Sequence, residues 1–196
     1  MITSANGDII DLVRSQSIDI IVNPANAELS EGGALCGQIY KEAGNLNLNE
    51  SLKNIHGIGE GSAVLTEGFN LCEHIIHTLA PRDTSYRRWG KLAGCYLSIL
   101  NIASRLADQG LVRDIAIPAI GTGVFNLPAK QADEVAWETV SNWQDKRKGS
   151  DPPLDVVFCF QDQHRHLKMI ERGADEFVWD DTDYKELCRA EGGYGE

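Results

Sequence analysis

The chain has 196 residues, 42% of them hydrophobic and 24% charged, which predicts one globular domain with a full core. Its formal net charge of −11 argues against sequence-independent binding of DNA or RNA, because phosphate contacts need clustered Lys and Arg. The five cysteines are scattered and odd in number, which indicates a reducing, cytoplasmic environment and argues against a disulfide framework.

Short apolar runs rich in Ile and Val predict buried strands, and helical stripes of apolar residues lie between them. In chain order, the expected strands are Ile18–Val22, Ser62–Thr66, His74–Leu79, Asp114–Ile120 and Asp155–Phe160. One expected helix carries Leu35, Ile39 and Ala43, a second runs from Leu92 to Ala107, and a third from Ala132 to Trp143. Strands that alternate with helices predict a layered α/β fold with helices on both faces of a sheet.

The C-terminal end differs in composition from the rest of the chain. Acidic residues and glycines gather there, so we expect a domain over residues 1–178 and an acidic, partly disordered tail over 179–196. The alternative is a short helix, because Tyr184, Leu187 and Cys188 are apolar at helical spacing.

Two glycine-bearing loops follow expected strands, at the sheet edge where α/β proteins bind ligands. The first runs from Asn23-Pro24-Ala25-Asn26 to Gly32-Gly33, which opens a helix whose dipole favours an anion. The second, Gly121-Thr122-Gly123-Val124-Phe125, offers freed backbone N–H groups and the Thr122 hydroxyl as a phosphate cradle. Each loop can also be an ordinary turn, and Phe125 can equally belong to the core.

Other charged and aromatic residues have plainer interpretations. Asp8 is a candidate for an adenine amine, although taken alone it is a better candidate for a helix cap. His164-x-His166 lacks further ligands at metal-binding spacing, so we expect a surface helix and no metal site. The basic clusters Arg87-Arg88 with Lys91 and Lys146-Arg147-Lys148 are interpreted as solvated faces. Tyr86 and Trp89 are expected in a polar loop that can rim a pocket.

The order of these motifs resembles that of a macro domain over about residues 1–175. The motifs that carry the resemblance are Gly7-Asp8-Ile9, Ile21-Val22-Asn23-Pro24-Ala25-Asn26, Gly32-Gly33, Ile76-His77-Thr78-Leu79-Ala80-Pro81 and Ile117-Pro118 with Gly121–Phe125. The resemblance implies a three-layer αβα sandwich with a central mixed sheet and a cleft for ADP-ribose.

The resemblance also implies a role for each matching residue. Asp8 would take the adenine amine, the Ile9 backbone another adenine edge, and Phe160 would stack on the base. The first diphosphate loop would be Gly32, Gly33, Ala34 and Leu35, and the second Gly121, Thr122, Gly123, Val124 and Phe125. Phe125 would lie against the distal ribose, and Asn26, the expected catalytic residue, would hold a distal-ribose hydroxyl.

One departure from the family pattern affects catalysis. Members that remove ADP-ribose from acidic side chains often read Gly-Gly-Gly-Gly-Val-Asp-Gly, where this chain reads Glu31-Gly32-Gly33-Ala34-Leu35-Cys36-Gly37. A thiol at position 36 is a poor general base beside a diphosphate, since negative charge raises its pKa. Glu31 and Ala34 replace glycines, which should stiffen the loop.

Three functions fit the same pocket. The first is hydrolysis of an ester at the distal ribose, from mono-ADP-ribosylated Asp or Glu in a protein or from O-acetyl-ADP-ribose. The second is a non-catalytic reader of ADP-ribose, which Cys36 favours, and the third is a phosphatase for ADP-ribose-1″-phosphate. We expect no cofactor and a monomer. No basic region precedes an apolar run at the N-terminus, and no apolar stretch is long enough to span a bilayer, so we expect no membrane partner.

Overall fold

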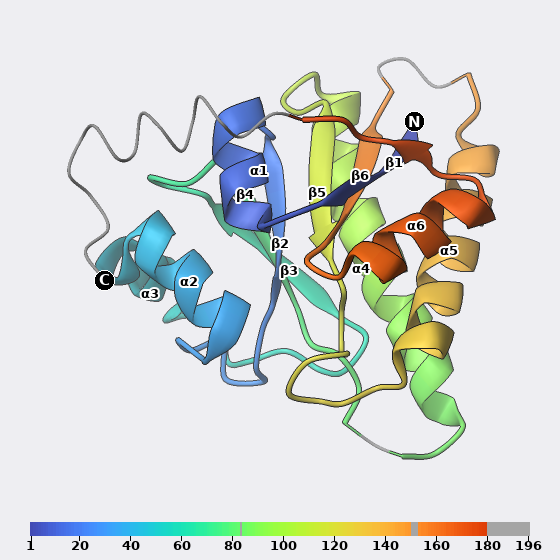
Figure 1. Cartoon of the computed structure of the whole chain (residues 1–196). Helices are drawn as coiled ribbons and strands as arrows, with labels where there is room; N and C mark the ends of the chain where they lie inside the picture. Colours follow the sequence, from blue (N-terminus) through green and yellow to red (C-terminus); the bar gives the residue numbers. More distant parts are fainter. Residues whose placement is uncertain (83, 150–152, 180–196) are drawn as a thin grey trace.

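The computed structural model describes residues 1–82, 84–149 and 153–179. They form one sheet with helices on both faces (Figure 1). In chain order the elements are β1 (Ile2–Asn6), α1 (Ile9–Gln16), β2 (Ile20–Pro24), α2 (Ala34–Ala43), α3 (Asn45–Leu52), β3 (Ala63–Glu67), β4 (His74–Thr78), α4 (Arg87–Asp108), β5 (Asp114–Pro118), α5 (Ala129–Lys146), β6 (Asp155–Phe160), α6 (Gln163–Arg172) and β7 (Asp175–Glu176).

The sheet has seven strands in the order β3-β4-β2-β5-β6-β1-β7. Every neighbouring pair is parallel except β3 and β4, which run antiparallel at one edge. The expected three-layer αβα sandwich with a mixed sheet is therefore confirmed. The carboxyl ends of β2, β5, β6 and β1 share one edge of the sheet, which is where the predicted ligand loops begin.

Successive side chains of each strand point to opposite faces of the sheet, so the core has two layers. Ile20 and Val22 pack with α4 and α5, whereas Ile21 between them packs with α1 and α2. All three side chains are fully buried. A parallel sheet covered by helices on both faces needs such continuous apolar strands, which explains why the Ile and Val runs were visible in the sequence.

The expected strands and helices are present with bounds that differ by at most five residues, and several further elements were not expected. Strand β2 begins two residues later than expected, because the Ile18 backbone N–H bonds the Val13 carbonyl at 3.0 Å and closes α1. The sequence did not predict β1, β7 or α3, whereas α1 is the helix that the cap interpretation of Asp8 implied. The expected tail at 180–196 lies outside the described residues, and the domain limit at 178 stays a prediction.

Two local expectations are wrong. His166 does lie on a helix, α6, but it is buried rather than at the surface, and its Nδ1 lies 3.0 Å from the Ser4 hydroxyl. Trp89 lies in the first turn of α4 rather than in a loop, while Tyr86 just before that helix is 90% exposed. Within the described residues, no helix combines the length and the apolar character needed to cross a membrane.

Candidate functional site

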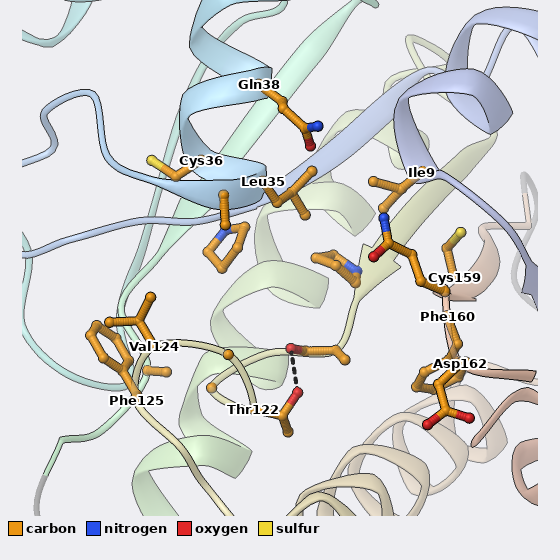
Figure 2. A pocket seen from close by; sticks show the side chains of 18 of the residues that line it. Ile9, Leu35, Cys36, Gln38, Thr122, Val124, Phe125, Cys159, Phe160 and Asp162 are labelled. Carbon is orange, nitrogen blue, oxygen red and sulfur yellow. Dashed lines mark hydrogen bonds between the residues drawn. The ribbon is translucent and has the colours of Figure 1, made fainter. Parts of the chain in front are cut away.

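A cavity of about 550 Å³ lies at the carboxyl edge of the sheet. Figure 2 shows Val124 and Phe125 at one end of it and Ile9 and Phe160 at the other. The first expected loop lines it through Gly33, Ala34 and Leu35, and the second through all of Gly121–Phe125. Cys36 lines it too, as the comparison of the first loop with the family pattern implied. The lining residues to which the sequence assigned no role in the site are Gly7, Pro24, Gln38, Ala80, Pro118, Ala119, Cys159, Gln161, Asp162 and Arg165.

The first loop delivers the N-terminus of α2 to the cavity. Gly33 precedes the helix with extended backbone angles, and no side chain caps the helix there. The first turn of a helix has N–H groups without intrahelical partners and a positive dipole end, which together suit an anion. A Cβ atom on Gly33 would meet no heavy atom within 4 Å, so this glycine leaves the backbone open towards a ligand. Gly32 does not line the cavity, and its own Cβ position lies 3.4 Å from the Cys36 sulfur.

The second loop holds its shape through its own backbone. Gly121 has φ +79°, and a Cβ atom there would lie 2.5 Å from the Leu127 side chain, so only glycine fits. The Leu127 N–H returns to the Gly121 carbonyl at 3.0 Å. Gly123 is different, because a Cβ atom on it would meet nothing within 4 Å. One glycine therefore makes the turn, and the other keeps the cavity side of the loop unobstructed.

The other end of the cavity is formed by the ends of β1 and β6. Ile9 and Phe160 line it, and the Phe160 ring stacks on Phe158 with centroids 6.4 Å apart. Asp8 is the N-cap of α1, since its Oδ1 accepts from the Ile10 N–H at 2.8 Å. The plainer interpretation of Asp8 as a helix cap is thus confirmed. Its role towards adenine stays a prediction, because Asp8 lies between cavity-lining residues without lining the cavity itself.

A tryptophan from the C-terminal side closes the wall next to Gly7. A Cβ atom on Gly7 would lie 2.5 Å from the Trp179 ring, so the indole occupies the space that a side chain would need. The Trp179 ring N–H points to the Asn6 carbonyl at 3.3 Å. Trp179 does not line the cavity itself, but it packs against Gly7, which does.

Asn26, the expected catalytic residue, braces its own loop. Its Oδ1 accepts from the Ser30 N–H at 3.0 Å, and its Nδ2 donates to the Ser30 carbonyl at 2.9 Å. Asn26 does not line the cavity. One proton of Nδ2 is left for a further bond, and that nitrogen lies 3.6 Å from the Cβ position of Gly32, on the side of the first loop.

Cys36 lines the cavity from the first turn of α2 and is itself 6% exposed. Burial raises the pKa of the Cys36 thiol, and hydrogen bonds from the Asn23 side chain and the Gly32 backbone oppose only part of that rise. Beneath it, the Asn23 Nδ2 contacts the His77 Nδ1 at 3.0 Å, and the His77 Nε2 contacts the Thr66 hydroxyl at 3.0 Å. Burial lowers the pKa of His77 to about 4, so the ring is neutral and serves as a scaffold at neutral pH.

Arg165 is the principal lining residue that the sequence did not reveal. Its Nε and Nη2 donate to both oxygens of Asp133 on α5 at 2.9 and 2.5 Å, and its Nη1 donates to the Thr122 hydroxyl at 3.0 Å. Its guanidinium also lies over the Phe160 ring, 5.2 Å from the centroid. Arg165 thus joins the second loop to the other end of the cavity. Its two hydrogen-bond partners lie 32 and 43 residues away in the chain, so no local spacing in the sequence indicated these bonds.

Comparison of the sequence with known proteins identifies its relatives. The family model for the Macro domain matches residues 22–136. A macro domain-containing protein of Listeria monocytogenes is 36% identical over 172 residues, covering 85% of this chain and 93% of the relative. The ADP-ribose glycohydrolase MACROD1 of Rattus norvegicus is 35% identical over 162 residues, covering 80% of this chain and 59% of the relative.

Solved structures agree with the sequence comparisons. The Trypanosoma brucei macrodomain in complex with ADP-ribose superposes with a TM-score of 0.73 at 27% identity, covering 87% of this chain and 68% of that one. The agreement extends over most of this chain and shows a common fold. This chain belongs to the macro domain family.

Proposed function

We propose that this chain binds ADP-ribose in the cavity and hydrolyses an ester at its distal ribose. The substrate would be a protein mono-ADP-ribosylated on Asp or Glu, or O-acetyl-ADP-ribose. The observation that carries the proposal is the pair of open glycines, Gly33 and Gly123, which present two backbone loops to the same cavity. Two such loops suit a diphosphate, which needs several N–H donors and tolerates no intervening side chain.

The two ends of the cavity fit the two ends of this ligand. The Phe160 ring and Ile9 offer an apolar wall for adenine, with the Ile9 backbone for a base edge and Asp8 within one residue of it. Phe125 at the opposite end would lie against the distal ribose. Asn26 would hold a hydroxyl of that ribose through its remaining amide proton.

In the reaction, the oxygen of water joins the acyl fragment and a proton joins the ribose oxygen. The ester bond breaks, the acyl fragment leaves as a carboxylate, ADP-ribose is released, and one proton passes to solvent. Cys36 is unsuited to activate the water, because burial raises the pKa of its thiol. We assign the activation of the water to the diphosphate of the ligand, which Gly33, Ala34 and the Gly121–Phe125 loop would hold. Relatives of this chain are named ADP-ribose glycohydrolases, which supports a hydrolase.

A reader without catalysis is the second candidate, and Cys36 is the observation that favours it. The deciding experiment has two arms. Calorimetric titration with ADP-ribose tests binding, and mass spectrometry of a Glu-linked ADP-ribosylated protein incubated with this chain tests turnover. Binding together with loss of the modification supports the enzyme. Binding without loss identifies a reader, and no binding at millimolar ADP-ribose contradicts both.

A glycine substitution tests the position of the site. Gly123→Val should fold normally and lose ADP-ribose binding, because its side chain would project into open space beside the second loop. Gly90→Val is the matched control, since a Cβ atom there also meets nothing within 4 Å and the residue does not line the cavity. A Gly123→Val protein that binds as well as the control would show that the loop is only a turn.

A further inference from the structure

A basic rim borders the Phe125 end of the cavity. We define it as Arg82, Tyr86, Arg87, Arg88 and Trp89, which lie between β4 and the first turn of α4. The chain enters this segment from Ala80, which lines the cavity. Figure 1 shows the start of α4 and the loop before α5 at the same end of the molecule, the lower one in that view.

Arg82 joins the rim to a residue that lines the cavity. Its guanidinium lies over the Phe125 ring, 4.7 Å from the centroid, and Phe125 lines the cavity. Tyr86 is 90% exposed, and Val124 beside Phe125 is 86% exposed. The surface at the Phe125 end of the cavity therefore offers both cationic and apolar side chains to a molecule that extends out of the cavity there.

The rim carries positive charge in a strongly acidic chain. Residues 82–91 contain four of the 18 Lys and Arg residues but only one of the 29 Asp and Glu residues. Lys91 is held by Glu60 at 2.6 Å. Among residues 1–82, 84–149 and 153–179, no carboxylate forms an ion pair with the guanidinium of Arg82, Arg87 or Arg88, while Arg88 lies over Trp89 at 4.6 Å.

We propose that the basic rim binds the polypeptide that carries the ADP-ribose and selects acidic sequence beside the modified residue. This inference rests on the proposed function, since the distal ribose would be the point of attachment. Charge complementarity favours an acidic peptide over nucleic acid. A peptide of a few residues meets only the rim, whereas a nucleic-acid strand continues beyond it over a surface whose net charge is negative.

The test uses peptides that cannot be hydrolysed. ADP-ribose is joined through a stable oxime to an aminooxy peptide flanked by three Asp residues, or to the same peptide with three Asn residues. We expect the full-length protein to bind the Asp peptide about tenfold more tightly at low salt, and the gain to shrink at high salt. Arg87→Glu/Arg88→Glu should abolish the gain and leave the affinity for free ADP-ribose unchanged.

The matched control reverses the other basic cluster. Lys146→Glu/Lys148→Glu makes the same charge change at the far end of α5, about 25 Å from the loop before that helix at 1.5 Å per residue. This control should keep the preference for the Asp peptide. Equal losses in the two double variants would mean that only the overall charge matters, which overturns the inference.

The remaining outcomes separate the inference from the proposed function. If the Asp and Asn peptides bind equally well and free ADP-ribose still binds, the proposed role of the rim is wrong and the proposed function stands. Absence of ADP-ribose binding overturns both. An oligonucleotide that carries ADP-ribose on its 5′-phosphate tests the alternative partner. If the protein binds it more tightly than the Asp peptide, and Arg87→Glu/Arg88→Glu removes that extra affinity, the partner is nucleic acid and the acidic-peptide proposal is wrong.

Discussion

Replacing Arg165 by Met should destabilise the protein far more than the same change at an exposed ion pair. The Asp133 side chain is 8% exposed and the Arg165 side chain 17%, and two hydrogen bonds join them. Removing one member of a buried pair leaves a charge without a partner and costs about 3–5 kcal/mol. Arg165→Met should therefore lower the free energy of unfolding by about 3 kcal/mol, measured by urea denaturation at pH 7.5.

Arg147 is a close structural match for Arg165. It also pairs with an aspartate of another helix, Asp108, at 2.7 Å, and its guanidinium also lies over an aromatic ring, that of Trp143, at 5.3 Å. The two pairs differ in that the Asp108 side chain is 54% exposed and accepts one hydrogen bond from Arg147, whereas Asp133 is buried and accepts two from Arg165. Arg147→Met should therefore cost only about 0.2–1 kcal/mol.

A second substitution, at Asp133, tests whether burial of the carboxylate is the cause. Adding Asp133→Asn to Arg165→Met should recover much of the lost stability, because a neutral amide costs less to bury without a partner than a charge. Equal destabilisation by Arg165→Met and Arg147→Met would refute the reasoning. So would a double variant at 133 and 165 that is less stable than Arg165→Met alone.

Three further predictions concern His77, Ala34 and Cys36. Burial lowers the pKa of His77 from its ordinary 6.5 to about 4 in the folded protein. Between pH 6.5 and pH 4, His77 is therefore protonated mainly in the unfolded chain. Stability should fall by about 3 kcal/mol as the pH drops from 6.5 to 4, and pH-dependent denaturation should show a flatter profile for His77→Gln. Ala34 has φ +49°, so Ala34→Gly should stabilise by about 0.5–1 kcal/mol in the same assay, whereas Ala93→Gly within α4 should destabilise by about 1 kcal/mol. Cys36→Ala should change ester turnover less than about tenfold and Cys36→Asp should raise it about 100-fold, whereas rapid alkylation of Cys36 at pH 7 with matching loss of activity would contradict this.

Strands and helices with a distinctive local composition could be predicted from the sequence. The Ile and Val runs of β4, β5 and β6 are buried on both faces, so their pattern survives in a single sequence. Strand β1, with the sequence Ile-Thr-Ser-Ala-Asn, has no such pattern. It is held between β6 and β7 by backbone pairing across most of the chain, which local composition does not encode.

The glycine loops of the site were predictable for a different reason. Glycine is needed where the backbone turns or approaches a ligand closely, so Gly33, Gly121 and Gly123 leave a local signal. Side-chain partnerships leave none. Arg165 is bound to a carboxylate 32 residues away, a contact that depends on packing in three dimensions. Asn26 is bonded to Ser30 within its own loop, where the chain path and not the residue type decides the partner.

The indole of Trp179, packed against Gly7, provides a built-in optical reporter. Tryptophan emission responds to the polarity and mobility of its surroundings, and this ring packs against Gly7, which lines the cavity together with Phe160. Adenosine alone should therefore shift the emission of the native protein, while ribose-5-phosphate should leave it nearly unchanged. A Trp179→Phe variant identifies the source of the signal, since three other tryptophans contribute to the spectrum. Occupancy of the two ends of the cavity thereby becomes separable in solution without any attached dye.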